Sequence, residues 1–355
     1  MTTAPPQRQL SPQELQAYKR DGVILIKNVL SGQQVEAGRA AVDAAIRNPG
    51  PQAEFLSPES TWDSVKDSFV EGSNEEKNVA DDANHASSWT MFQDQFSSKR
   101  CPDMMDFIRQ SPAPQLASQV LAATVPSNIR SNDTTPSATA TLFYDHVIVK
   151  KPTPSKSSNT IPWHQDLPYW AVQGTLASVW MCFDDMPQEA AVQWILGSHH
   201  WGIYQPRHFV DASPYAGTED MTPMPEDLDD RIAAGTLQAT AFDAQPGDAL
   251  LFDARIIHGS PGNAPSSCSD ETADESLAAQ QESSHTSSSK HASIPHRRVA
   301  IRFAGSDVQF CQYRDPSTGA ITRETAIPTP DINHSLKDGD FLRKDTTTFP
   351  TLWPG

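Results

Sequence analysis

The stretch "ATATLFYDHVIVK" (residues 138–150) marks the point where the hydrophobic pattern of this chain changes to a period of two. Each segment of this kind is bounded by Gly, Pro or Asp turn signals. A succession of short strands without long helices between them predicts a mainly β fold with a jelly-roll (double-stranded β-helix, cupin-like) core from about 138 to 310. The further segments are "LASVWMCFDD" (176–185), "AAVQWI" (190–195), "GTLQATAFDA" (235–244), "DALLFDARIIHGS" (248–260) and "RRVAIRFAG" (297–305).

Helices are expected before this core, on its flank. In "LSPQELQAYKRDG" (10–22), Ser11 can cap a helix, Pro12 occupies the favoured first helical position and Gly22 ends it. A short apolar strand, "GVILIKNVL" (22–30), comes next. The spacing of apolar residues in "SGQQVEAGRAAVDAAIRN" (31–48) predicts a second amphipathic helix.

The chain is expected to form one domain over residues 11–354, preceded by a flexible tail of residues 1–10. Residues 264–296 are rich in Ser and poor in large apolar residues. Such a segment cannot bury enough surface to offset the entropy of ordering, so we expect a disordered insertion within the domain.

Composition favours a small-molecule substrate. The chain has 355 residues, with 44 acidic against 27 basic side chains and a net charge of −17. This charge argues against nucleic acid and against an anionic membrane surface as partners. The longest apolar runs are too short to span a membrane, and no oligomeric state can be read from the sequence.

Cysteine usage points to a reducing compartment. The four cysteines, Cys101, Cys182, Cys268 and Cys311, form no CxxC pair and follow no apolar leader. We therefore expect reduced thiols in an intracellular, cytoplasmic protein.

The motif "IPWHQDLPYW" (161–170) places His164 two residues before Asp166. On a strand, this spacing puts both side chains on one face. A second histidine, His258, ends the β-run of "PGDALLFDARIIHGSPGN" (246–263). Two histidines and one carboxylate form the facial triad that binds Fe(II) and leaves positions open. Taken singly, the HxD pair is also compatible with a capped turn or a solvated polar face, and His258 with an ordinary strand-end histidine.

The wider context of this motif resembles the phytanoyl-CoA dioxygenase (PhyH-like) family of Fe(II)- and 2-oxoglutarate-dependent oxygenases, from about residue 12 to residue 354. The segments occur in family order. They are "YKRDGVILIKNVL" (18–30), "LFYDHVIVKKP" (142–152), "WHQDLPYW" (163–170), "SVWMCFDDM" (178–186), "GSHHWG" (197–202), "PGDALLFDARIIHGSPGN" (246–263), "RRVAIRFAGSDVQF" (297–310), "LKDGDFL" (336–342) and "FPTLWP" (349–354).

The resemblance implies Fe(II), 2-oxoglutarate and O2 as metal, co-substrate and oxidant. It implies His164, Asp166 and His258 as iron ligands, and Trp180 and Ser260 as lining of the 2-oxoglutarate pocket. It further implies hydroxylation of an unactivated C–H bond in a small metabolite or acyl substrate, with release of succinate and CO2. The presence of Asp166 favours hydroxylation, or a desaturation or ring-forming variant of it, over halogenation.

Relatives also hold the distal carboxylate of 2-oxoglutarate with an arginine, which suits a carboxylate because its planar fork gives two hydrogen bonds. If Val299, Ile301 and Phe303 form the apolar face of their strand, then residues 298, 300 and 302 share the other face. We therefore expect Arg298 to bind the carboxylate. Arg297 is the second candidate, Arg302 a neighbour and Arg255 a further alternative.

Three residues are candidates for substrate contact. Tyr169 and Trp170 follow the HxD pair and either line the substrate mouth or pack in the core. Lys150 lies near the mouth, where it either meets an anionic substrate or is simply solvated. The nine other histidines, His146 among them, lack a partner carboxylate at strand spacing and are assigned no role.

Two other functions stay open at this point. One is a catalytically silent, cupin-like metal- or ligand-binding protein. The other is a zinc hydrolase using the same two histidines and carboxylate.

Overall fold

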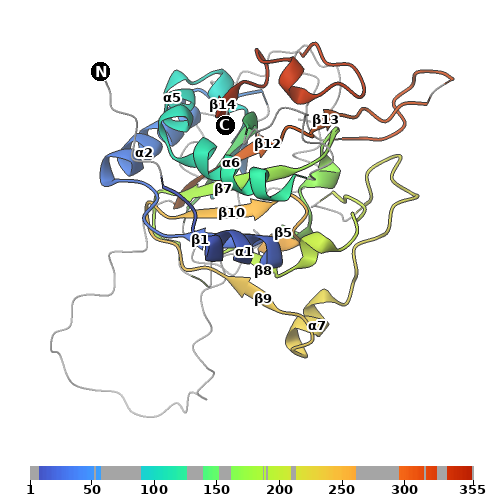
Figure 1. Ribbon diagram of the computed structural model, residues 1–355, viewed down its shortest axis with the longest axis horizontal. Helices are drawn as coiled ribbons and strands as arrows, with labels where there is room; N and C mark the ends of the chain where they lie inside the picture. Colours follow the sequence, from blue (N-terminus) through green and yellow to red (C-terminus); the bar gives the residue numbers. More distant parts are fainter. Residues whose placement is uncertain are drawn as a thin grey trace.

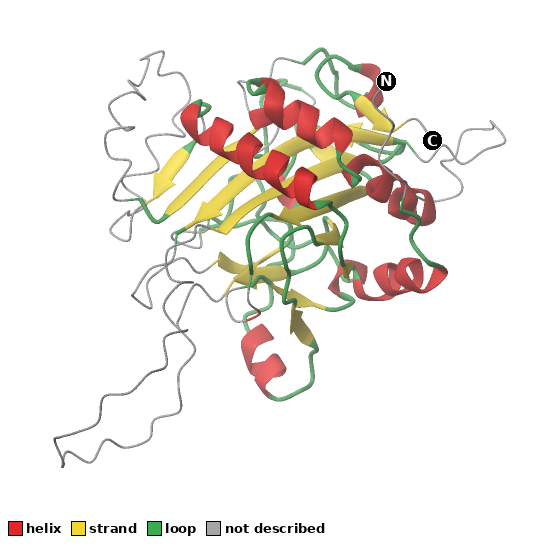
Figure 2. Cartoon of the chain, turned by 90° about the vertical axis from the view of Figure 1, so that its left-hand side faces the viewer, coloured by secondary structure: helices red, strands yellow, loops and turns green. Residues whose placement is uncertain are grey.

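Two β-sheets pack against each other, and helices cover the outer face of the larger one (Figures 1 and 2). The computed structural model describes residues 8–51, 53–56, 89–125, 139–151, 161–186, 188, 191–208, 213–260, 296–315, 317–325 and 334–353. The predicted tail apart from residues 8–10, and the predicted insertion apart from His296, lie outside the described residues. The predicted mainly β, jelly-roll class is confirmed.

The larger sheet has the strand order β1, β10, β7, β12, β4, β3 and β2, with β14 paired to β4. Pairing is antiparallel throughout. The sheet extends beyond the predicted core, because strands from both ends of the chain join its edges. Its strands are β1 (Val23–Ile26), β2 (Glu54–Leu56), β3 (Met91–Gln95), β4 (Ala140–Lys150), β7 (Leu176–Cys182), β10 (Ala249–Asp253), β12 (His296–Ala304) and β14 (Thr351–Trp353).

The smaller sheet has four antiparallel strands in the order β5, β11, β8 and β9. A further two-stranded ribbon joins β6 (Val172–Gln173) to β13 (Gln309–Phe310). The bounds of the smaller sheet are β5 (Ile161–His164), β8 (Gln193–Ile195), β9 (Ala239–Ala241) and β11 (His258–Ser260).

Helices pack on the outer face of the larger sheet, as Figure 2 shows. The predicted first helix is confirmed as α1 (Pro12–Asp21), with Ser11 and Glu14 in a capping box and Gly22 in a left-handed C-cap. The predicted second helix is confirmed as α2 (Gly32–Arg47). Helices α5 (Pro102–Gln110), α6 (Ala113–Thr124) and α7 (Leu228–Ala233), with the short 3-10 turns η3 (Ser97–Lys99), η4 (Leu167–Tyr169), η6 (Ser198–His200) and η7 (Leu342–Lys344), were not predicted.

The central strands of the larger sheet are buried on both faces. Along β12, Val299, Ile301 and Phe303 pack against the helices. Ala300, between them, belongs to the cluster that fills the space between the sheets, together with Trp180 of β7. Odd-numbered side chains of β12 therefore face the helices, and even-numbered ones face the interior between the sheets.

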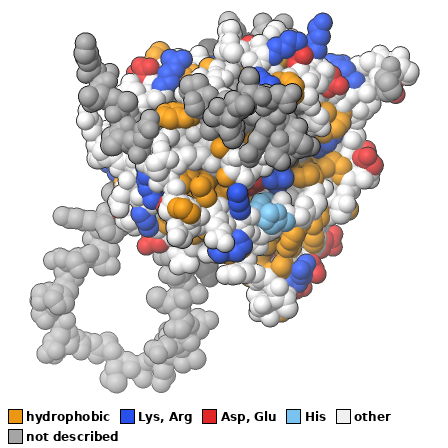
Figure 3. Space-filling view, viewed as in Figure 1, with side chains coloured by type: hydrophobic (Ala, Val, Ile, Leu, Met, Phe, Trp, Pro, Cys, Tyr) orange, Lys and Arg blue, Asp and Glu red, His pale blue; other side chains and the backbone are white. Residues whose placement is uncertain are grey.

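Both signs of charge occur on the face of the molecule drawn in Figure 3, with apolar side chains between them. In the part of the chain that the structure describes, no helix is both long enough and apolar enough to cross a bilayer.

The contact between α2 and the sheet generates a stability prediction. A Cβ added at Gly38 would overlap the ring of Phe183, which also packs edge-on against Phe107 of α5. Alanine normally stabilises a helix interior relative to glycine by about 1 kcal/mol. We expect Gly38→Ala instead to lower the free energy of unfolding by about 1–3 kcal/mol, the usual cost of overpacking.

Gly32, at the start of the same helix, is the matched control, because nothing lies within 4 Å of an added Cβ there. Urea unfolding of both variants measures the difference. Gly32→Ala should leave stability unchanged or slightly raised. Equal stabilisation by the two substitutions would show that the close helix–sheet contact is not limiting.

Candidate metal centre

His164, Asp166 and His258 meet at one end of the smaller sheet. His164 is the last residue of β5 and His258 the first of β11, and the two are paired across the strands. One oxygen of Asp166, Oδ1, lies 3.8 Å from His164 Nε2 and 3.7 Å from His258 Nε2. One ligand atom from each residue fits within 4.8 Å of the others. This spacing is suited to one shared metal ion.

The backbone conformation that brings Asp166 to the two histidines differs from the predicted one. The sequence analysis placed His164 and Asp166 on one strand face. Strand β5 ends at His164, and Asp166 has a helical backbone conformation (φ −72°, ψ −45°) where the chain enters η4. The aspartate therefore reaches the histidines from the turn that follows the strand.

Hydrogen bonds orient both imidazoles. Nδ1 of His164 lies 2.9 Å from the carbonyl oxygen of Pro162, and Nδ1 of His258 lies 3.0 Å from that of Ile256. A carbonyl can only accept, so each Nδ1 carries the proton and each Nε2 presents a lone pair to the shared space. Burial lowers the pKa of His164 to about 3 and also lowers the pKa of His258. Both rings are thus neutral, the form that binds a metal.

Asp166 is held ionised by its surroundings. Burial alone would raise the pKa of Asp166, but the charge and hydrogen bond of Arg302 oppose this effect, and that pKa is lowered. Nη2 of Arg302 lies 3.3 Å from Asp166 Oδ2, and its guanidinium lies over the ring of Tyr144 at 4.8 Å. Because Oδ2 faces Arg302, Oδ1 is left to face the histidines.

Two residues that the sequence analysis did not single out frame the centre. The ring of Trp194 stacks on His258 with centroids 4.8 Å apart and planes 20° apart. The amide of Gln165 donates to the carbonyls of Gly202 and Arg255 and accepts from the N–H of Tyr204. Gln165, which lies between the two residues of the HxD pair, therefore ties the turn to the neighbouring loops.

Unpartnered polar atoms gather in the interior between the sheets. Arg298 is 3% exposed, and its Nε and Nη2 have no hydrogen-bond partner among the described residues. The same holds within the described chain for Trp180 Nε1, Ser178 Oγ and His146 Nε2. Buried polar groups are rarely left without partners. Their concentration around the small side chain of Ala300 fits a polar ligand that lies in this space.

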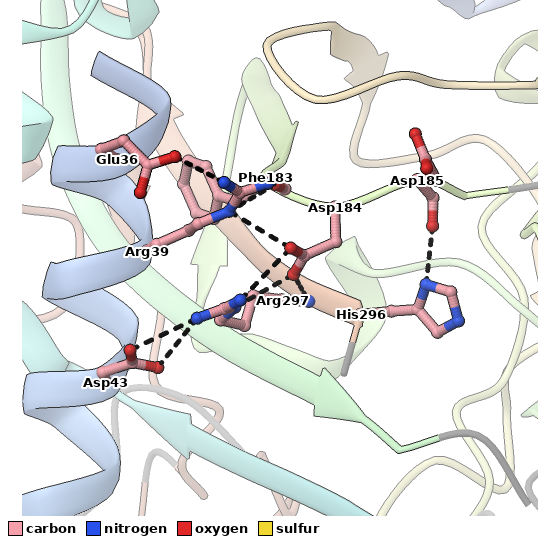
Figure 4. A network of polar contacts seen from close by, with 8 residues as sticks. All are labelled: Glu36, Arg39, Asp43, Phe183, Asp184, Asp185, His296 and Arg297. Carbon is pink, nitrogen blue, oxygen red and sulfur yellow. Dashed lines mark hydrogen bonds and ion pairs between the residues drawn. The ribbon is translucent and has the colours of Figure 1, made fainter. Parts of the chain in front are cut away.

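The alternative candidate, Arg297, lies on the opposite side of β12. Its guanidinium makes ion pairs with Asp184, at 3.0 Å, and with Asp43 of α2, at 3.3 Å (Figure 4). Arg39 bonds the same Asp184 from the helix. Arg297 thus ties β12 to α2 and does not reach the interior, whereas Arg298 does.

The other pocket candidates also have defined positions. Trp180 lies in the interior with the guanidinium of Arg298 5.5 Å from its ring centroid. Ser260 is buried on β11, two residues beyond His258. Arg255 pairs with Asp253, at 2.7 Å.

A cavity of 170 Å³ opens beside the centre, and His164 is part of its lining. Tyr169 also lines it, with the phenolic oxygen fixed by the backbone carbonyl and N–H of Arg207. The wall also includes Trp163, Tyr204 and His208. Tyr169 therefore occupies one of the two positions that the sequence analysis left open, the wall of a cavity and not the core.

Trp170 and Lys150 do not lie at the mouth. Trp170 is 2% exposed and packs edge-on against Phe143 and Tyr144, because η4 turns its side chain into the core. Lys150 is also 2% exposed, neither solvated nor in the cavity wall. It lies near the interior end of β12, where Arg298 affects its charge.

His146 was assigned no role from the sequence, yet it is paired with Ala300 across β4 and β12. His146 is partly buried, and burial, assisted by Arg302, lowers its pKa to about 3. The signal that places it was present in the sequence. His146 and Lys150 are four residues apart and therefore lie on one face of β4. Arg298 and Arg302 are likewise four residues apart and lie on one face of β12.

Comparisons with known proteins agree with this geometry. The family model of phytanoyl-CoA dioxygenase (PhyH) matches residues 18–267. The carbocyclase SnoK, a non-heme α-ketoglutarate-dependent enzyme of nogalamycin biosynthesis, has a similar structure, with a TM-score of 0.56 and 14% identity over 96% of each chain. The epimerase SnoN of the same biosynthesis gives 0.53 and 15% over 96% of this chain and 100% of its own. A search of curated proteins found no match.

At these identities the solved structures establish a shared fold, while the family match covers most of the chain. That match, together with the His–Asp–His group, confirms the expected class of enzyme. The chain belongs to the phytanoyl-CoA dioxygenase family and is an Fe(II)- and 2-oxoglutarate-dependent oxygenase.

Proposed function

We propose that this enzyme hydroxylates an unactivated C–H bond of a small metabolite or acyl substrate and releases succinate and CO2. The observation that carries the proposal is the carboxylate of Asp166, which is ionised and fixed by Arg302 beside both histidines. The side chains of Asp166 and the two histidines would hold the metal and leave positions open for the co-substrate and O2. With Asp166 as a ligand, a halide would find no place at the metal.

His164, Asp166 and His258 would hold the iron, since two neutral imidazoles and one carboxylate are the donor set that non-heme Fe(II) takes. Iron with bound 2-oxoglutarate supplies the oxidising power for the reaction with O2. The protein contributes geometry. The carbonyls of Pro162 and Ile256 fix the imidazoles, and Arg302 fixes the carboxylate.

Arg298 would bind the distal carboxylate of 2-oxoglutarate in the interior, with Trp180 and Ser260 along the pocket wall. The support is the pair of guanidinium nitrogens of Arg298 that have no partner among the described residues, since a buried donor without an acceptor is costly. Between Arg298 and Arg302 on the same strand face lies the small side chain of Ala300. SnoN, which shares the fold, was crystallised with Fe3+ and α-ketoglutarate.

The substrate would enter through the cavity beside His164, whose wall combines aromatic rings with the polar side chains of Arg207 and His208. Tyr169 would position the substrate with its ring, because both hydrogen-bonding capacities of its hydroxyl are taken by Arg207. Lys150 and Trp170 would not contact the substrate from the positions that they occupy.

Removing one iron ligand tests the metal assignment. Anaerobic protein with Fe(II) and 2-oxoglutarate should show a weak visible metal-to-ligand charge-transfer band. We expect His164→Ala to abolish this band, because the loss of a ligand typically lowers metal affinity well beyond the 10–100-fold that loss of a supporting hydrogen bond costs. His200→Ala is the control, since His200 is exposed and lies in η6 outside the centre. Absence of the band in metal-loaded wild-type protein would favour the silent binding protein or the zinc hydrolase.

The two neighbouring arginines of β12 form a matched pair for the 2-oxoglutarate site. We expect Arg298→Met to raise the Kd of 2-oxoglutarate on the order of 100-fold, since loss of one partner of a buried charge pair costs about 2–5 kcal/mol. Arg297→Met should leave this Kd unchanged and lower stability, because the ion pairs of Arg297 with described residues are those to Asp184 and Asp43. Titration of anaerobic Fe(II) protein measures both constants. Equal effects of the two substitutions on Kd would rule out Arg298 as the specific anchor.

The reaction type is tested separately from binding. Turnover with a small-metabolite extract under 18O2 should give a product that carries one 18O atom and equimolar succinate. A product that lacks the label, formed with succinate release, would indicate desaturation or ring formation in place of hydroxylation.

A further inference from the structure

Arg207 lies in the wall of the cavity that His164 also lines, and the proposed function gives its side chain no specific role. The cavity has a volume of 170 Å³, and the rings of Tyr169 and Tyr204 form part of the same wall. Arg207 is partly buried. In the part of the chain that the structure describes, its guanidinium makes no hydrogen bond and no ion pair, and its Nε is buried. A buried donor without an acceptor is costly, so this side chain is suited to a ligand that accepts hydrogen bonds.

Most other polar side chains of this wall already have partners within the protein. The indole of Trp163 and the amides of Gln165 and Gln205 each donate a hydrogen bond to another segment of the chain. The ring of His208 lies 3.6 Å from the carboxylate of Glu324. The guanidinium of Arg207 is therefore the cationic group of the wall that folding leaves available to a ligand.

The backbone of Arg207 is fixed in place. Its N–H donates to the hydroxyl of Tyr169 at 3.1 Å, and its carbonyl accepts from the same hydroxyl at 2.8 Å. Beside it, the N–H of Tyr215 donates to the carbonyl of Pro206. Tyr169 in turn follows Asp166 by three residues, through the turn η4. A group held on such a backbone loses little conformational freedom when it binds a ligand.

The charges around Arg207 favour a ligand with a single negative charge. Glu226 belongs to the same wall but is exposed, so that water and salt screen its charge. Glu324 faces His208. A carboxylate carries one charge, and its two oxygens match the planar fork of a guanidinium. A phosphate dianion would bring a second charge that has no cation of its own in this wall.

We propose that the substrate is a small organic acid whose carboxylate is bound by Arg207, while its apolar part lies against the rings of Tyr169 and Tyr204. This inference rests on the proposed function, because it names the class of substrate for the same site. The volume of 170 Å³ is below the roughly 300–1,000 Å³ of sites for drug-sized ligands, which favours a small molecule. An acyl thioester has no free carboxylate and would leave the guanidinium without this acceptor.

Three probes of similar shape test the proposal on anaerobic protein loaded with Fe(II) and 2-oxoglutarate. They are 3-phenylpropanoate, the uncharged 3-phenylpropanamide and 2-phenylethyl phosphate, and calorimetry measures the Kd of each. The charge-transfer band is followed in parallel, to show that the acid does not displace 2-oxoglutarate. We expect the acid to bind about tenfold more tightly than the amide, since a hydrogen bond between charged groups is stronger than a neutral one.

Equal affinities for acid and amide, tighter binding of the phosphate than of the acid, or no binding of any probe would overturn the proposal. Each of these results leaves the proposed function intact as long as the charge-transfer band forms. Failure of the wild-type protein to form the band with Fe(II) and 2-oxoglutarate would instead remove the proposed function.

Variants then assign the preference to one residue. Arg207→Gln should raise the Kd of the acid about tenfold and leave that of the amide unchanged, whereas Arg207→Lys, which keeps the charge, should retain part of the preference. Arg231→Gln is the matched control, because Arg231 lies in α7 outside the cavity wall, with its guanidinium over the ring of Trp201. The charge-transfer band of each variant is checked first. A preference for the acid that survives in Arg207→Gln would refute the role of Arg207.

Discussion

Alternation of side chains along β12 is the constraint on which the rest of the structure depends. The strand pairs with β4 on one side and β7 on the other, so its backbone polar groups are used and its side chains must lie on one of two covered faces. Arg297 and Arg298 are adjacent in the chain but serve different purposes. Arg297 binds the acidic groups that attach helix α2, while Arg298 is directed into the interior. A shift of one residue in register would exchange the two roles.

The two faces of the larger sheet have different roles: one packs against the helices and stabilises the fold, and the other faces the proposed binding site. The helix-facing side holds the continuous apolar cluster that contains Val299, Ile301 and Phe303. The interior side holds polar atoms without partners in the described chain, which is costly for a protein in the absence of ligand. Those atoms persist because the apolar face and the flanking strands hold the backbone in place. A ligand that satisfies them gains the hydrogen bonds that folding left unmade.

Much of the fold and part of the site could be predicted from sequence because both follow from periodicity. The alternation of apolar residues predicted the strands and placed Arg298 on the strand face opposite to that of Val299. The capping residues Ser11 and Gly22 predicted the first helix. The helical turn at Asp166 and the inward rotation of Trp170 were not predictable, because neither has a periodic signal. Both depend on how the chain leaves β5 after His164.

His146 and Lys150 show a different limit. Their spacing shows that both side chains lie on the same face of β4. The spacing alone does not say whether that face is the one lined by other basic groups. That depends on the pairing of β4 with β12, two segments about 150 residues apart in the chain. Lys150 was therefore expected near the mouth, either in contact with an anionic substrate or solvated, and His146 was assigned no role. Only the register of the two strands brings His146 beside Ala300 and Lys150 beside His296.

The interior charge also explains how an acidic protein can bind a dianion. The chain carries a net charge of −17, yet the interior side of β12 presents the buried Arg298 and Arg302. At physiological ionic strength, exposed charges are screened beyond about 8 Å. Buried charges are screened much less, so the few interior cations dominate the potential that a bound carboxylate experiences. In the proposed site, the affinity for 2-oxoglutarate would therefore depend on the interior cations more than on the acidic surface.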